Sequence, residues 1–193
     1  PDIERTVSEY LAKNGVPQYA ISETQKFGHV TYFWNGNNSE KFDKELETWV
    51  EIPSDRISFD QAPRMKADEI ADALIEALES GKYKFLRCNF ANGDMVGHTG
   101  SLDAAITAVE AVDQNVKRLL DSAAKVGATV VIVADHGNLE DLTVRNHTRN
   151  PVPAILIGAP KPRQKFTNDL KDLSDIYPAI LSFFTDLNFL SNF

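Results

Sequence analysis

The sequence predicts an α/β layered fold with a largely parallel central sheet. Segments with apolar residues at helical spacing alternate along the chain with short apolar segments typical of strands. One of these apolar segments, residues 129–134, is almost uninterrupted, as in strands that are buried on both faces of a sheet. This alternation favours helices packed on both faces of the sheet.

Four segments have the spacing of helices. Residues 5–14 end before Gly15, and residues 70–81 end at Gly81. The longest helix is expected between Ser101, a suitable N-cap, and Gly127, a suitable end. The fourth, residues 173–184, contains Pro178, which a helix accommodates only near its first turn or with a kink.

Four segments are expected to be strands. Residues 29–34 are rich in β-branched and aromatic side chains and end at a turn signal. The others are residues 83–90, 129–134 and 152–157. Residues 53–63 contain two prolines, which predicts a loop with room for a short edge strand at residues 56–59.

Composition excludes several classes of protein. The 193 residues suit a single domain spanning residues 1–193, and Lys+Arg 20 against Asp+Glu 28 gives a net charge of −8. An acidic surface disfavours nucleic acid and anionic membranes as partners. The single cysteine, Cys88, excludes an internal disulfide framework and a cysteine-rich zinc site. The sequence shows neither a membrane-length apolar run nor signal-peptide features, which predicts a cytoplasmic protein.

Histidines and aspartates collect at the ends of the predicted core strands. Asp94 and His98 follow one strand, Asp135 and His136 follow another, and His147 precedes the last. Ligands bind beyond the carboxyl ends of strands in such folds. A mixed set of imidazoles and carboxylates suits Mn, Zn, Fe or Co better than calcium. Taken singly, each aspartate has the alternative of a cap or turn residue.

Five segments of the sequence resemble the cofactor-independent phosphoglycerate mutases, which are members of the alkaline phosphatase superfamily. They occur in the family's order and are residues 23–31, 32–36, 89–100, 134–138 and 147–153. The stretch Asp-Met-Val-Gly-His-Thr-Gly at residues 94–100, together with Asp-His-Gly-Asn at residues 135–138, is highly specific for this family. The resemblance implies an alkaline-phosphatase-like fold.

The resemblance also implies two metal ions in a complete site. Asp94, His98 and His147 would hold one manganese, while Asp135 and His136 would supply part of the second site. Mg²⁺, Zn²⁺ and Co²⁺ are alternatives to Mn²⁺. The family converts 3-phosphoglycerate to 2-phosphoglycerate through a phosphoserine intermediate.

Lys26 is expected to meet the substrate phosphate; without the family likeness it reads as a solvated loop lysine. The family's first strand, its nucleophilic Ser and its inserted transferase domain are not found in residues 1–193. We therefore expect the C-terminal part of a phosphatase-type domain, with no catalytic nucleophile of its own and no mutase activity alone. The alternatives are another phosphatase, sulfatase or phosphomutase of the superfamily, or a non-catalytic α/β fragment.

Overall fold

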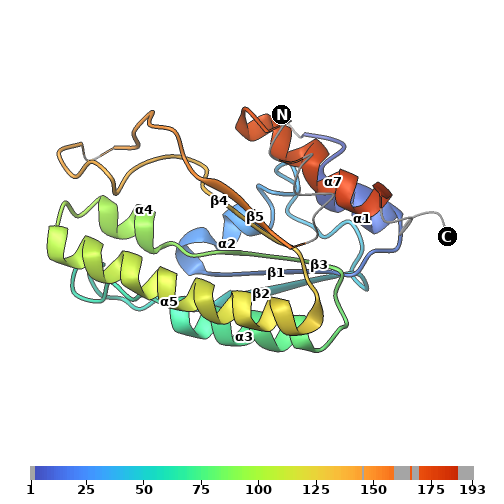
Figure 1. Ribbon diagram of the computed structural model, residues 1–193, viewed down its shortest axis with the longest axis horizontal. Coiled ribbons are helices and arrows are strands. Elements are labelled where there is room, and N and C mark those ends of the chain that lie inside the picture. The colour runs from blue at the N-terminus through green and yellow to red at the C-terminus, as the bar shows by residue number, and fades with distance from the viewer. Residues whose placement is uncertain (1–2, 145, 159–165, 167–169, 187–193) are drawn as a thin grey trace.

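The computed structural model describes residues 3–144, 146–158, 166 and 170–186 (Figure 1). The structure confirms the predicted α/β class, with a parallel sheet and helices on both of its faces. In chain order, its elements are α1 (Val7–Lys13), β1 (Gln18–Glu23), α2 (Thr24–Val30), β2 (Glu47–Ile52), α3 (Ala67–Glu79), β3 (Phe85–Asn89), α4 (Asn92–Gly97), α5 (Leu102–Val126), β4 (Val130–Val133), β5 (Ala154–Ile157), the short 3₁₀ helix η1 (Leu173–Asp175) and α7 (Ile176–Asp186).

The central sheet has three parallel strands in the order β2–β1–β3. All six residues of β1, the middle strand, are buried because neighbours cover both of its edges and both of its faces. Since the strands are parallel, the carboxyl ends of β1 and β3 lie at the same edge of the sheet. That edge is where α2 and α4 begin.

Helices α3 and α5 pack against each other on one side of the sheet, and α1 and α7 lie on the other (Figure 1). The first side buries Tyr19 and Ile21 of β1 against Ile70 and Leu74 of α3. The second side has its own apolar cluster, whose buried members are Val7, Leu11, Val16 and Ile180. Each face of the sheet therefore contributes to a separate part of the core.

Helix α5 follows its sequence prediction closely. The Ser101 hydroxyl accepts a hydrogen bond from the Ala104 N–H (3.4 Å), and Gly127 ends the helix with a left-handed backbone, φ 70°. In the described part of the chain, no helix combines the length and the apolar character needed to cross a membrane.

Strand β4 departs from the prediction that it is buried on both faces. It pairs with β5 in a separate two-stranded antiparallel sheet, and among the described residues β5 is its single strand partner. None of its four residues is fully buried, and Val133 is 41% exposed.

The prediction of a strand at residues 29–34 is also wrong. Residues up to Val30 belong to α2, and the chain then turns, with the Thr31 hydroxyl donating to the Phe27 carbonyl (2.7 Å). Tyr32 and Phe33 are exposed, so their aromatic rings do not pack into a sheet. Residues 56–59 likewise form turns and loop instead of the short edge strand.

Candidate metal centre

Helix α4 brings Asp94 and His98 together. The helix begins just after β3, at the carboxyl edge of the sheet, with Asp94 in its first turn and His98 as its C-cap. Residues four apart lie on the same side of a helix. His98 Nε2 is accordingly 3.1 Å from Asp94 Oδ1.

Two further histidines reach Asp94 from the segments around the second sheet. His136 follows β4 and His147 precedes β5, and an antiparallel bridge between Gly137 and Thr148 holds the two segments side by side. The two imidazole rings stack with centroids 3.4 Å apart and planes 14° apart. The Nε2 atoms of His147 and His136 are 3.0 Å and 4.0 Å from Asp94 Oδ1.

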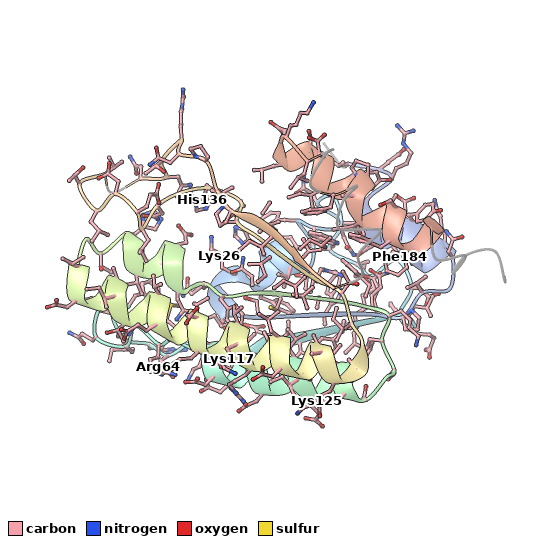
Figure 2. All side chains as sticks on the ribbon, in the orientation of Figure 1. Lys26, Arg64, Lys117, Lys125, His136 and Phe184 are labelled. Atoms are coloured by element: carbon pink, nitrogen blue, oxygen red, sulfur yellow. The ribbon has the colours of Figure 1, made fainter. Side chains whose placement is uncertain are left out.

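Lys26 approaches the other oxygen of the same carboxylate. It lies in α2, and its Nζ is 2.5 Å from Asp94 Oδ2, with side chains 8% and 14% exposed. Figure 2 shows Lys26 and His136 facing the same region between the two sheets. A nearly buried ammonium group beside the histidine cluster is not the solvated lysine that the sequence leaves as an alternative.

The Asp94 carboxylate is strongly stabilised in its charged form. Burial alone would raise its pKa, but hydrogen bonds from Lys26 and Asn138, together with the Lys26 charge, lower the pKa to about 2. An ionised carboxylate is the form that binds a cation.

The donor set fits a divalent metal ion. One ligand atom each from Asp94, His98 and His147 lies within 4.8 Å of the other two. Two imidazole nitrogens and one carboxylate oxygen form the kind of mixed set that suits Mn²⁺, Zn²⁺ or Co²⁺.

Asp135 does not belong to this tight group. Its side chain is 61% exposed, and its Oδ1 is 3.5 Å from His136 Nε2. The structure therefore brings three of the five expected ligands together, places His136 against them, and leaves Asp135 at the rim. The remaining histidine, His29, lies in α2 and packs edge-on against Phe33, with ring centroids 5.5 Å apart.

Sequence reasoning gave no role to Asn138, although it follows the Asp-His-Gly segment directly. Its side chain is buried, and its Nδ2 donates to Asp94 Oδ1 (2.9 Å) and to the Asp94 carbonyl (3.2 Å). Gly97 makes room for it, because a Cβ at that position would lie 2.6 Å from Asn138 Oδ1. Asn138 thus fixes the orientation of the carboxylate at the centre of the cluster.

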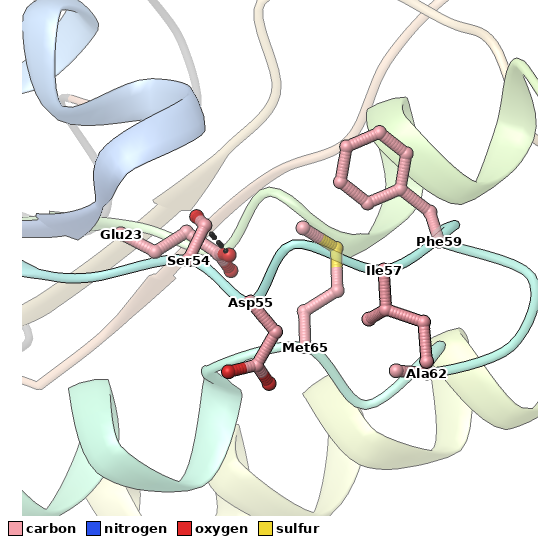
Figure 3. A pocket seen from close by; sticks show the side chains of 7 residues that line it. All are labelled: Glu23, Ser54, Asp55, Ile57, Phe59, Ala62 and Met65. Carbon is pink, nitrogen blue, oxygen red and sulfur yellow. Dashed lines mark hydrogen bonds between the residues drawn. The ribbon is translucent and has the colours of Figure 1, made fainter.

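A small pocket lies beside the loop that precedes α3 (Figure 3), and none of the residues that line it is a histidine. Its buried acid, Glu23, accepts hydrogen bonds from the Ser54 hydroxyl (2.7 Å) and the Lys66 N–H (3.3 Å). Burial raises the pKa of Glu23. These contacts tie the loop and the start of α3 to the end of β1, which is a structural role.

The fold and the cluster define a class of protein, and comparison with known sequences agrees. The sequence profile of the metalloenzyme superfamily matches residues 1–186, so the chain belongs to that superfamily.

Within the superfamily, the chain is similar to phosphoglycerate mutases. The chain is 48% identical to the 2,3-bisphosphoglycerate-independent phosphoglycerate mutase of Trypanosoma brucei brucei, over 88% of the chain. It is also 48% identical to the enzyme of that name from Zea mays, over 89% of the chain. It spans 34% of the length of each, about a third of these curated relatives.

The fold is similar to a crystal structure of Leishmania mexicana phosphoglycerate mutase determined at low cobalt concentration. The TM-score is 0.80 at 47% sequence identity, covering 82% of this chain and 32% of that one. These likenesses confirm both the family resemblance and the fold class that the sequence predicts.

Proposed function

We propose that this chain is the metal-binding part of a phosphoglycerate mutase that interconverts 3-phosphoglycerate and 2-phosphoglycerate in glycolysis and gluconeogenesis. The observation that carries the proposal is the meeting of Asp94, His98 and His147 at one point, in a chain similar to mutases along most of its length. The reaction passes through a phosphoserine whose serine lies outside residues 1–193. This chain supplies ligands and charge but no nucleophile.

Mn²⁺ is the ion that we propose for the site, with Mg²⁺, Zn²⁺ or Co²⁺ as alternatives. Asp94, His98 and His147 hold one ion, and their spacing supports this assignment. Asp135 and His136 contribute to a second site that needs further ligands from the rest of the protein. When bound, the two ions lower the pKa of an attacking hydroxyl and offset charge on a leaving oxygen.

Lys26 is proposed to bind the phosphate of the substrate. Its ammonium group is nearly buried and lies beside the carboxylate at the centre of the cluster. A positive charge in a site that excludes water stabilises the charge that spreads over phosphoryl oxygens during transfer. Lys26 therefore holds the phosphate next to the metal ligands.

We propose further that residues 1–193 form one domain, the C-terminal part of a phosphatase-type domain in a cytoplasmic enzyme. Its partners are phosphoglycerate and the preceding and transferase segments of the same protein, with no nucleic acid or membrane partner. The chain alone is inactive because the serine comes from those segments.

The test is a coupled assay of 2-phosphoglycerate formation with Mn²⁺. The protein translated from the complete reading frame is expected to be active, its Asp94→Asn variant to be inactive, and its Glu110→Ala variant, which alters an exposed acid on α5, to match the wild type. The isolated chain is expected to show no turnover.

Three results would contradict the proposal. Turnover by the isolated chain would remove the need for an outside nucleophile. A complete protein that hydrolyses phosphate or sulfate esters without mutase activity would point to another enzyme of the superfamily. A complete protein without activity or metal binding would point to a non-catalytic fold.

A further inference from the structure

Glu140 connects the two segments that carry His136 and His147. Its Oε2 accepts a hydrogen bond from the Asn138 N–H (2.7 Å), two residues after His136. Its Oε1 accepts from the Thr148 hydroxyl, one residue after His147, and from the Asn150 side-chain amide (3.0 Å). One carboxylate thus spans both sides of the loop.

The backbone around this carboxylate is arranged for close contact. Gly137 and Thr148 form the antiparallel bridge, with the Thr148 N–H donating to the Gly137 carbonyl (2.9 Å). A Cβ on Gly137 would collide with Glu140 Oε1 and with the Thr148 hydroxyl, so these groups pack directly over the glycine. The carboxylate therefore lies directly against the backbone of the bridge.

Glu140 itself is not a metal ligand in this arrangement. Both oxygens are occupied by neutral donors, and the group of ligand atoms found among the described residues consists of Asp94, His98 and His147. These donors, the Thr148 hydroxyl first, lower the pKa of Glu140 to about 2, so it stays ionised over the working range. Glu140 therefore accepts hydrogen bonds and does not act as a proton donor.

We propose that Glu140 is a positioning residue that holds the His136 and His147 segments at the separation that metal binding requires. This inference rests on the proposed metal site. The stacked rings, 3.4 Å apart, sit at the end of the bridge that Glu140 braces. Asn138 extends the same chain of contacts, because its N–H binds Glu140 while its side chain binds Asp94.

A positioning residue of this kind acts by preorganisation, because it holds the metal ligands in place before the ion binds. His147 is half exposed and lies in a loop, so without Glu140 the loop must be ordered each time an ion binds. Outer partners that orient metal ligands typically contribute about 10- to 100-fold to metal affinity. We expect Glu140→Ala to weaken Mn²⁺ binding by about that factor.

The experiment titrates Mn²⁺ by calorimetry into the 193-residue chain and into three variants. Glu140→Ala is expected to lose affinity, and Glu140→Gln to retain part of it, because an amide oxygen still accepts from one side of the loop. Glu110→Ala removes a similarly exposed acid from α5 and is expected to match the wild type. At saturating Co²⁺, Glu140→Ala is expected to change the visible spectrum, which reports ligand geometry and not fold stability.

The outcomes separate the two proposals. If the wild type binds Mn²⁺ and Glu140→Ala shows the same affinity and the same Co²⁺ spectrum, the positioning role is wrong and the proposed function stands. If the wild type itself binds no metal, the proposed function is contradicted. In that case, hydrogen exchange of the Thr148 N–H tests the positioning role of Glu140. Glu140→Ala is expected to accelerate this exchange at least about tenfold. Unchanged exchange would overturn the positioning role.

Discussion

Replacing Gly97 with alanine tests the contact that orients Asp94 without changing any proposed ligand. The new Cβ would lie 2.6 Å from Asn138 Oδ1 and 2.9 Å from its Cγ. Asn138 is held against Asp94 and is only 4% exposed, so its side chain cannot accept the new Cβ in its present position. Its side chain must therefore move away from Asp94, and the two hydrogen bonds between them are lost.

The size of the effect follows from these contacts. The hydrogen bond from Asn138 Nδ2 to the ionised Asp94 carboxylate is 2.9 Å long, and such bonds contribute about 1.5–3 kcal/mol. The second bond, to the Asp94 carbonyl, is 3.2 Å long and contributes about 1 kcal/mol. Alanine gains up to about 1 kcal/mol over glycine in a helix. Gly97→Ala is expected to lower the free energy of unfolding by about 2 kcal/mol.

Gly93 provides the matched control because it lies in the same helix, and nothing lies within 4 Å of a Cβ built there. Gly93→Ala is expected to be neutral or stabilising by up to about 1 kcal/mol. Urea unfolding of the 193-residue chain, followed by circular dichroism, measures both variants. Equal stability of Gly97→Ala and Gly93→Ala would refute the packing argument.

Two further predictions concern the core and the response to pH. Ile21→Ala removes a fully buried side chain from β1 and is expected to cost about 3 kcal/mol, whereas Ile106→Ala, at a half-exposed position on α5, is expected to stay within about 0.5 kcal/mol in the same urea experiment. The hydrogen bond from Asn115, followed by those from Arg64, lowers the pKa of Asp68 below 3.8, so its contribution is present above that pH and lost as the pH falls further. Asp68→Asn is expected to flatten the acid side of a plot of the free energy of unfolding against pH, with a total change of less than about 1 kcal/mol because the side chain is half exposed; an unchanged slope would contradict this.

Elements with strong local signals were predictable from the sequence. The long helix between Ser101 and Gly127 has a stripe of apolar residues and a residue suited to each end, and all of these signals lie within the segment itself. Strand β4 was predictable from its apolar run. Its burial was not, because burial depends on which other strands lie beside it.

The sequence did not predict strand β1, because the strand is stabilised by contacts with residues that are distant along the chain. Half of its residues are polar, and they are buried because their partners come from elsewhere in the chain. Gln18 bonds to Ser8, and Glu23 accepts from Ser54 and Lys66. Conversely, residues 29–34 have the composition of a strand, but β2 and β3 occupy both edges of β1, and residues up to Val30 belong to α2.

The sequence predicted those residues of the candidate site that lie next to the ends of the strands. Asp94, His98, His136 and His147 flank core strands, which is why their types and places alone suggested metal binding. Asn138 and Glu140 were not predictable, because their roles arise from contacts across the fold. Asn138 meets a residue 44 positions away, and Glu140 meets both sides of a loop that the pairing of β4 with β5 and the bridge at Gly137 bring together.

The most direct test of the metal centre is a calorimetric titration of Mn²⁺ into the wild-type chain and its His98→Ala and His29→Ala variants. His98 is a member of the ligand group, whereas His29 lies in α2 and is not. We expect His98→Ala to lower the affinity at least about tenfold, because it removes one of three ligands, and His29→Ala to bind as the wild type does. Equal Mn²⁺ affinity in His98→Ala and the wild type would contradict the central claim.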